Sequence, residues 1–209
     1  MMTDSPNDPA RMAEVLSLAG EGDDIIHSAL EFVRTHFGME VGYLSEFVGD
    51  ELVFRAVSAP GFEELVFEGH VMPVAAAYCP YILSGELPEL MPDTTKVPFT
   101  KRLAVTDAVP IRSHISVPIR RSDGSVYGMF CCLSREVNPS LNDRDLGVMR
   151  AFAALSANAL NESLGRQSEL QEVQERSEVA LNGAVEIHYQ PIFDTETLQA
   201  VGVEALSRF

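Results

Sequence analysis

The sequence has 209 residues, of which 46% are hydrophobic and 22% are charged, a composition typical of a folded protein with one or two domains. Its formal net charge of -16, from 15 basic and 31 acidic residues, excludes nucleic acid as an expected partner, because such binding depends on Lys and Arg contacts to phosphates. Three cysteines make no disulfide framework, no window suits a membrane span, and the acidic N-terminus is unlike a signal peptide, so we expect a cytoplasmic protein with no membrane partner.

The N-terminal region predicts a polar tail and two helices. Residues 1–22 contain the tail and a short helix at 11–19. The next stretch begins with two aspartates and ends at Gly38, as a helix with an acidic first turn and a glycine C-cap does. Its apolar stripe consists of Ile26, Leu30, Val33 and Phe37.

A hairpin and an irregular region follow this helix. Runs of strand-forming residues at 41–48 and 52–59 are joined by a short loop that contains Gly, which predicts an antiparallel hairpin. The region 60–112 is rich in Pro and Gly but keeps enough apolar residues to be packed. Within it we expect one helix at 74–83 and a short strand at 90–91. A connection of this length inside a compact domain is usually functional or disordered.

A second hairpin and a long helix come next. The runs 115–120 and 126–133 flank an Asp-Gly pair, which is among the stronger short-range signals of a hairpin turn. The neighbouring Cys131 and Cys132 are expected to point to opposite faces of the sheet and to pack there as free thiols. Ser140-x-x-Asp143 resembles a capping box and predicts the start of the helix.

The helix is expected to continue through a linker at 162–183. Leu170, Val173, Ser177 and Ala180 follow at alternating spacings of three and four residues, with polar residues between them. This pattern is typical of a short, imperfect coiled-coil seam. It predicts a homodimer that pairs through this helix.

The last segment contains two strand-like runs around an acidic turn. Gln190-Pro191 lies in the first run, and Glu204-Ala205-Leu206-x-Arg208 lies in the second. The pair resembles the opening of an EAL domain, the family of cyclic di-GMP phosphodiesterases. The resemblance implies a (β/α)8-type barrel, which needs about 200 residues or more. We therefore expect 184–209 to be an N-terminal fragment of a truncated EAL domain, which by itself has no activity.

The EAL resemblance also implies roles for individual residues. Glu204 would ligate Mg or Mn, which prefer carboxylate oxygens and can activate water toward a phosphodiester. Gln190, Leu206 and Arg208 would contact cyclic di-GMP in the complete domain. Further metal ligands are expected on strands beyond this sequence. The alternative is that Glu204 and Arg208 are simply charged residues on an amphipathic strand.

The order helix, hairpin, variable middle, hairpin, long helix resembles a GAF domain at 23–161. The segments that carry the resemblance are Ser113–Ile119, Asp123-Gly124, Val126–Met129, Tyr78-Cys79-Pro80 and Met91-Pro92-Asp93. The resemblance implies an α+β fold with an antiparallel sheet flanked by helices, and an unknown small-molecule ligand. A ligand pocket would be lined by Tyr78, Cys79, Asp93, Thr106, Asp107, His114 and Ser116.

The residues around this pocket bear on several ligand classes known for the family. Cys79 is followed by Pro80, whereas bilin-binding members typically have Cys followed by His, and haem ligation by His114 is the less expected alternative to a structural role. The Asn-Lys signature of cyclic-nucleotide-binding members is not matched, because Thr95 precedes Lys96. The favoured function is a sensor that passes a small-molecule signal through the linker to an EAL output. The alternatives are a cyclic di-GMP phosphodiesterase in a longer parent and a ligand-free dimerisation scaffold.

Overall fold

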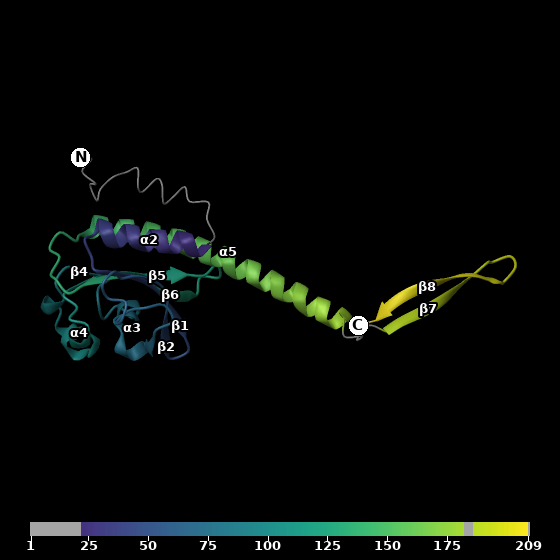
Figure 1. Ribbon diagram of the computed structural model, residues 1–209, viewed down its shortest axis with the longest axis horizontal. Coiled ribbons are helices and arrows are strands. Elements are labelled where there is room, and N and C mark those ends of the chain that lie inside the picture. The colour runs from purple at the N-terminus through teal and green to yellow at the C-terminus, as the bar shows by residue number, and fades with distance from the viewer. Residues whose placement is uncertain (1–21, 182–185, 209) are drawn as a thin grey trace. The chain divides into compact units, whose positions relative to one another are not determined.

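A six-stranded antiparallel sheet, in the order β3-β2-β1-β6-β5-β4, forms the centre of the first part of the chain (Figure 1). The computed structural model describes residues 22–181 and 186–208, so the helix predicted at 11–19 lies outside the described residues. The chain divides into two compact units, of which the first ends at Ser163 and the second begins at Leu164. The finer division into sensor, linker and C-terminal fragment stays a prediction.

Both predicted hairpins are present in the sheet. The strands are β1 (Val41–Val48), β2 (Glu51–Ser58), β3 (Val71–Pro73), β4 (Leu90–Met91), β5 (Ser113–Arg120) and β6 (Val126–Ser134). β1 pairs with β2, β5 pairs with β6, and β1 also pairs with β6, which joins the two hairpins into one sheet. The turn between β5 and β6 contains Gly124 at φ 85°, a conformation that glycine adopts without steric cost. The short edge strand β3 was not predicted.

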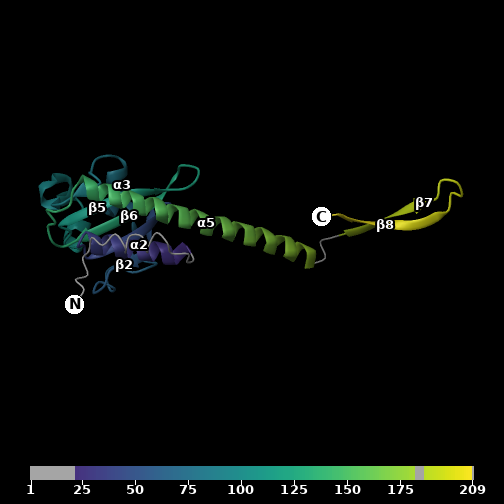
Figure 2. The same cartoon turned by 90° about the horizontal axis from the view of Figure 1, so that it is seen from above.

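Two helices lie side by side on one face of the sheet (Figures 1 and 2). They are α2 (Gly22–His36) and α5 (Asp143–Leu181). The predicted stripe of α2 is buried in a core between these helices and the sheet, together with Phe130, Cys132 and Phe152. We call this the helix-side core. Gly22 shows how closely the helices pack, because a Cβ atom added there would lie 2.9 Å from the carbonyl oxygen of Ala159.

The start of α5 is capped two residues later than the sequence predicted. Asn142 Oδ1 accepts a hydrogen bond from the Arg144 backbone N–H at 3.0 Å, and Asp145 Oδ2 accepts one from the Asn142 N–H at 3.1 Å. Ser140 instead hydrogen-bonds Asn138 Oδ1 in the preceding turn. The capping box is therefore Asn142-x-x-Asp145, and the capping box predicted at Ser140-x-x-Asp143 is wrong. Asparagine and aspartate can supply the two reciprocal hydrogen bonds that Ser and Glu make in the usual capping box.

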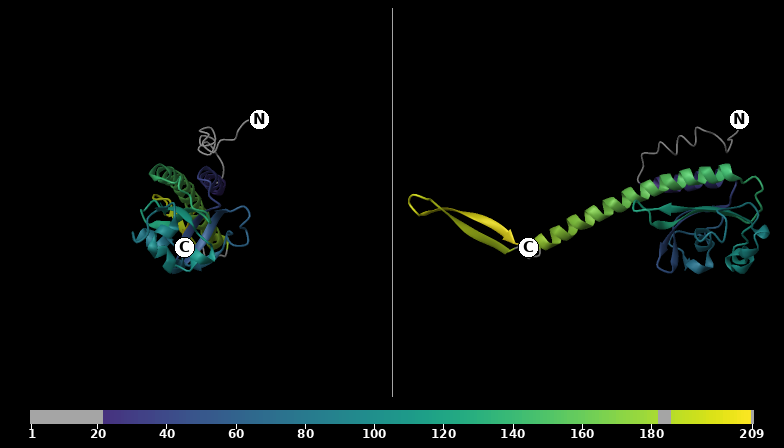
Figure 3. Two further views of the ribbon diagram at one scale, coloured as in Figure 1. Left: turned by 90° about the vertical axis from the view of Figure 1, so that its left-hand side faces the viewer. Right: turned by 180° about the vertical axis from the view of Figure 1, so that it is seen from behind.

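Short helices cover the opposite face of the sheet (Figure 3). These are α3 (Cys79–Leu83), α4 (Val105–Ala108) and the 3-10 turns η1 (Val74–Ala76), η2 (Thr94–Lys96) and η3 (Pro98–Arg102). The single helix predicted at 74–83 is wrong. Its two pieces are separated at Ala77, whose backbone is extended at φ -89° and ψ 167°. Pro80 explains the break, since proline is tolerated in the first turn of a helix but disrupts a helix interior.

Between these short helices and the sheet lies a second core, the cavity-side core, which includes Tyr43, Cys79, Met129 and Cys131. Cys131 and Cys132 thus face opposite sides of the sheet, as predicted, and both are buried free thiols.

The second unit contains the end of α5 and a hairpin of β7 (Glu186–Phe193) and β8 (Ala200–Arg208). In the turn, Asp194 Oδ1 accepts hydrogen bonds from the backbone N–H groups of Glu196 and Thr197. Six large apolar side chains on the strands of the hairpin are exposed: Ile187, Tyr189, Ile192, Phe193, Val201 and Val203. In the parts of the chain that the structure describes, no helix is long and apolar enough to cross a membrane.

Candidate ligand-binding site

A cavity of about 330 Å³ lies on the face of the sheet opposite α2 and α5. The sheet contributes Tyr43 from β1, Phe54 from β2, His114 from β5 and Leu133 from β6. The facing wall comes from the segment around η1 and from α4, and it includes Ala76, Ala77, Ala104, Val105 and Ala108. Leu65 and Val66 add to the lining from the loop between β2 and β3. The cavity volume lies at the lower end of the range of about 300–1,000 Å³ for ligand pockets.

His114 is the main polar feature of this cavity. Its side chain is only 1% exposed, and its Nδ1 atom has no hydrogen-bond partner among the described residues. Burial lowers the pKa of His114 to about 3, so the imidazole is neutral at pH 7. Buried polar atoms almost always have a partner, and an unpaired one destabilises the protein. A ligand or water in the cavity would remove that cost.

Tyr78 lies against His114 and is anchored by two threonines. The Tyr78 hydroxyl is 2.7 Å from Thr106 Oγ1, and Thr106 Oγ1 donates to the Thr100 carbonyl at 2.6 Å. Because the single Thr106 hydroxyl proton is used in that second bond, Tyr78 must donate to Thr106. Burial also raises the pKa of Tyr78. The Tyr78 side chain is therefore a neutral part of the cavity wall, held in place by a hydrogen bond in which its hydroxyl proton is donated to Thr106.

The cysteines near the cavity have no features of a reactive site. Tyr43, Cys79 and Cys131 are all buried in the cavity-side core. Burial raises the pKa of the Cys131 thiol and that of the Tyr43 hydroxyl well above their ordinary values. Because the thiolate is the reactive form of cysteine, Cys131 is inert at neutral pH and acts as a small apolar residue.

The structure brings together only part of the predicted pocket. Tyr78 and His114 line the cavity, and Thr106 does not line it but hydrogen-bonds the Tyr78 hydroxyl. Asp93 caps η2 through the Thr95 backbone N–H, and Asp107 is exposed on α4. Cys79 and Ser116 are buried but do not line the cavity, although the Ser116 hydroxyl also lacks a partner among the described residues.

Sequence reasoning missed the apolar walls contributed by residues 65–77 and 104–111. These residues have no motif, and only their packing around one space identifies them. The signal that was available in the sequence was the concentration of alanine and valine in two otherwise irregular segments.

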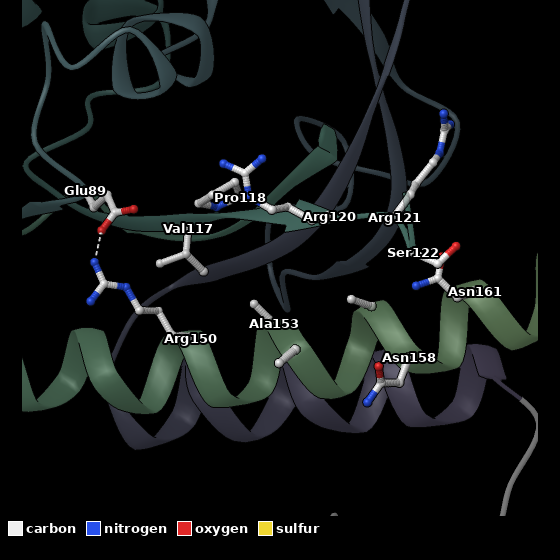
Figure 4. Close-up of a pocket in the computed structure, with 12 residues that line it drawn as sticks. Glu89, Val117, Pro118, Arg120, Arg121, Ser122, Arg150, Ala153, Asn158 and Asn161 are labelled. Carbon is white, nitrogen blue, oxygen red and sulfur yellow. Dashed lines mark hydrogen bonds and ion pairs between the residues drawn. The ribbon is translucent and has the colours of Figure 1, made fainter. Parts of the chain in front are cut away.

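A second hollow, a surface groove of about 510 Å³, lies between β5 and α5 (Figure 4). Arg150 reaches Glu89 across one end, with Nη2 2.6 Å from Oε2. The guanidinium groups of Arg120 and Arg121 are directed away from α5 in Figure 4, and both have partners, the Gly124 carbonyl at 3.1 Å and Glu46 at 3.6 Å. None of the unpartnered buried side-chain atoms in the described residues lines this groove. The cavity is therefore the better candidate for a ligand site.

Three of the four candidate residues of the C-terminal hairpin lie on the same face of it. Gln190 is paired with Glu204, and Leu206 follows two residues later, so these three side chains point to the same side. The Arg208 side chain lies outside the described residues. No group of three or more His, Cys, Asp or Glu side chains within 22–181 and 186–208 is placed to hold a metal ion. Glu204 is exposed and alone does not supply the ligand set of Mg²⁺ or Mn²⁺.

Comparisons with known proteins address the first unit. The chain is similar to the GAF domain of a phosphoenolpyruvate-protein phosphotransferase from Acinetobacter, with 12% identity, a TM-score of 0.60, and coverage of 78% of this chain and 97% of that chain. It is similar to the phycocyanobilin-bound GAF domain of a cyanobacterial phytochrome, with 16% identity, a TM-score of 0.59, and coverage of 78% and 97%. It is also similar to the free methionine-R-sulfoxide reductase of Neisseria meningitidis, with 18% identity, a TM-score of 0.56, and coverage of 77% and 88%.

At these identities the likeness shows the fold and not the ligand. No curated protein sequence matches the chain. The family model for the GAF domain matches residues 21–160 and does not extend to 184–209, so the EAL resemblance of that segment stays a prediction. With the antiparallel sheet, the flanking helices and the matched sequence in agreement, the chain belongs to the GAF domain family.

Proposed function

We propose that this protein is a sensor whose GAF domain binds a small molecule in the cavity beside Tyr78 and His114. The observation that carries the proposal is the neutral, fully buried imidazole of His114, which lines a largely apolar cavity and has an unpartnered Nδ1 atom. Pockets that combine apolar walls with a few convergent polar groups are the usual form of small-molecule sites. The phytochrome neighbours carry bilins in the same fold, which supports ligand binding as a role of this domain type.

The cavity is connected to α2 by one specific contact. His27 Nε2 on α2 lies 2.6 Å from Glu68 Oε1, in the loop that supplies Leu65 and Val66 to the cavity wall. Partial burial alone would lower the pKa of His27, but hydrogen bonds to Glu68 and to the Asp23 carbonyl raise it above its ordinary value. A ligand that moves the loop would therefore act directly on α2. Such a ligand shifts the protein only if it binds two conformations with different affinities.

The end of α5 provides a route from the domain to an output. Leu170 and Val173 are 68% and 60% exposed, and they belong to the predicted coiled-coil seam. Exposed apolar residues at this spacing favour pairing with the same helix of a second copy. In the homodimer, a change in the register or angle of paired helices would carry the signal.

The proposed output is an EAL-type phosphodiesterase acting on cyclic di-GMP. It is supported by the sequence of the β7–β8 hairpin and by the register that puts Gln190, Glu204 and Leu206 on one face. In a complete EAL domain, Glu204 would join further carboxylates in holding Mg or Mn. For the present chain, we expect no hydrolysis of cyclic di-GMP with either metal. Measurable turnover would show that the output site is not built as the EAL resemblance implies.

A thermal-shift screen of small molecules with the full chain tests the sensor function. Ala77 is 4% exposed and lines the cavity, so Ala77→Phe fills it, and Leu133→Phe fills it from the sheet. Ala75 is exposed and outside the cavity, which makes Ala75→Phe the matched control. We expect compounds that stabilise the wild type and Ala75→Phe but not the two filled variants. A screen in which every stabilising compound acts equally on all four proteins would contradict the proposal.

A further inference from the structure

We infer that the cavity takes a neutral, planar aromatic molecule of one or two rings with one hydrogen-bonding group directed at His114. Indole and phenol are the simplest members of this class. The inference rests on the proposed sensor function and adds to it the chemical class of the ligand. It draws on the charge, the ring content, the polar atoms and the volume of the cavity.

The lining has no permanent charge to balance a charged ligand. None of the residues that line the cavity is Asp, Glu, Lys or Arg, and of the two lining histidines, His70 and His114, His114 is neutral at pH 7. A charged ligand beside His114 would lose its hydration on entry and would find no carboxylate, ammonium or guanidinium group in return, which is strongly unfavourable. Carboxylates, phosphates and ammonium groups are therefore poor ligands for this cavity.

Aromatic rings make up much of the lining. Tyr43 and Phe54 have ring centroids 4.7 Å apart, and Phe54 contacts His70 at 5.5 Å in an edge-to-face arrangement. Tyr78 and His114 form a further pair of rings. The opposite wall, from η1 and α4, consists of Ala and Val side chains. Aromatic rings favour stacked or edge-to-face contacts with other rings, so this lining selects a planar aromatic body over a flexible aliphatic one.

Among the buried side-chain polar atoms of the described residues that line the cavity, one lacks a hydrogen-bond partner. His114 Nδ1 is buried without a partner, whereas the Tyr78 hydroxyl proton is already donated to Thr106. The nitrogens of a neutral imidazole act as one donor and one acceptor, so a hydroxyl or a ring N–H on the ligand can pair with Nδ1 in its acceptor tautomer. A hydrogen bond from the ligand to Nδ1 would contribute to the free energy of binding, whereas a purely apolar cavity would offer no such hydrogen bond.

The volume sets the size of the ligand. A cavity of about 330 Å³ corresponds to about eleven water molecules at about 30 Å³ each. One or two fused rings with a single substituent fit this space. A linear tetrapyrrole, the kind of ligand carried by the bilin-bound neighbours, has four rings and is larger than the class inferred here.

Titration of the full chain with indole tests the inference, because the protein has no Trp whose fluorescence would mask that of indole. Three probes are compared: indole, 1-methylindole, which lacks the N–H, and indole-3-carboxylate, which adds a negative charge. We expect indole to bind about two- to tenfold tighter than 1-methylindole, the range of one neutral hydrogen bond. We expect indole-3-carboxylate to bind at least about tenfold weaker than indole.

The variants locate the binding. His114→Phe keeps a ring at this position but removes the hydrogen bond, so indole and 1-methylindole should bind it equally. Ala77→Phe should abolish indole binding, and Ala75→Phe should not. Each variant is first checked for a cooperative thermal transition, and Leu133→Phe replaces Ala77→Phe if the latter does not fold.

Two results would overturn the inference. Binding of indole-3-carboxylate as tight as that of indole would show that the cavity accepts charge. Absence of indole and phenol binding, while other compounds stabilise the wild type and not Ala77→Phe, would leave the sensor function standing and reject the aromatic class. If no compound distinguishes wild type from Ala77→Phe, the sensor function itself fails.

Discussion

The Tyr78 ring meets the His114 imidazole edge to face, with centroids 5.1 Å apart and planes at 67°. Tyr78 precedes α3 and His114 lies on β5, so the contact joins the short helices to the sheet at the cavity. Thr106 holds the Tyr78 hydroxyl from the side of α4. The Tyr78 ring therefore restricts the orientation of the imidazole before any ligand enters, and His114 Nδ1 has no hydrogen-bond partner among the described residues.

The buried histidine predicts a dependence of stability on pH. In the folded protein the pKa of His114 is about 3, and in the unfolded chain it is about 6.5. Between these values only the unfolded state binds the proton, so the free energy of unfolding should fall as pH falls from about 6.5 toward 3. One such group contributes a slope of at most about 1.4 kcal/mol per pH unit.

Urea unfolding at a series of pH values, in the wild type and His114→Phe, measures this slope. The difference between the two proteins isolates His114 from the surface carboxylates, which titrate in the same range. Curves that run parallel for both proteins below pH 6 would show that His114 is not buried as described.

Two serines predict opposite effects of the same substitution. Ser156 on α5 is fully buried, and its hydroxyl has no partner among the described residues, so Ser156→Ala should raise the free energy of unfolding by roughly 1 kcal/mol. Ser113 is also fully buried, but it donates to the Glu136 carbonyl at 2.8 Å. Ser113→Ala should therefore lower stability by about 1 kcal/mol. Chemical denaturation measures both changes, and destabilisation by Ser156→Ala would contradict the packing described for α5.

Gly128 marks the closest backbone approach in the sheet. A Cβ atom at this position would lie 1.7 Å from the Ser45 carbonyl oxygen, on the strand paired with β6. Gly128→Ala must displace the β1 backbone, and we expect a loss of about 3 kcal/mol or more. Gly147, exposed in α5 with open space around it, is the control, and Gly147→Ala should stabilise by about 0.5–1 kcal/mol. Melting temperatures of the two variants test the prediction, which equal effects would refute.

The exposed seam of α5 predicts the oligomeric state. Leu170→Lys combined with Val173→Lys places two charges where the partner helix would pack, so sedimentation analysis should show monomers in place of dimers. Ser168→Lys with Gln171→Lys adds the same charge to exposed positions outside the seam and should leave the dimer intact. A dimer that persists in the first variant would mean that the protein does not associate through this helix.

Local signals were sufficient for much of the fold. The stripe of α2, its Gly38 cap at φ 62° and the Asp-Gly turn between β5 and β6 all depend on residues close together in the chain. Their order led to the GAF family. Pro80 is also a local signal, because a proline inside a helix at 74–83 favours a break before it.

The cavity itself could not be predicted, because its walls come from segments far apart in the sequence. The GAF resemblance implies a pocket that includes Tyr78, Asp93 and His114, and the structure places Tyr78 and His114 at the cavity. Asp93 does not line it and instead satisfies its own turn through Thr95. Tertiary packing decides which polar residue is left without a partner, and of the three described residues with such an atom, His114, Ser116 and Ser156, His114 is the one that lines the cavity.

A small molecule that occupies the cavity should pair with His114. Nitrogen NMR of the His114 imidazole tests it most directly, with the full chain measured alone and with the compound that stabilises it most. If a small molecule pairs with His114, the Nδ1 resonance should shift in the wild type and in Ala75→Phe, and the compound should not bind to Ala77→Phe. A compound that binds and stabilises the protein while the Nδ1 resonance stays unchanged would contradict it.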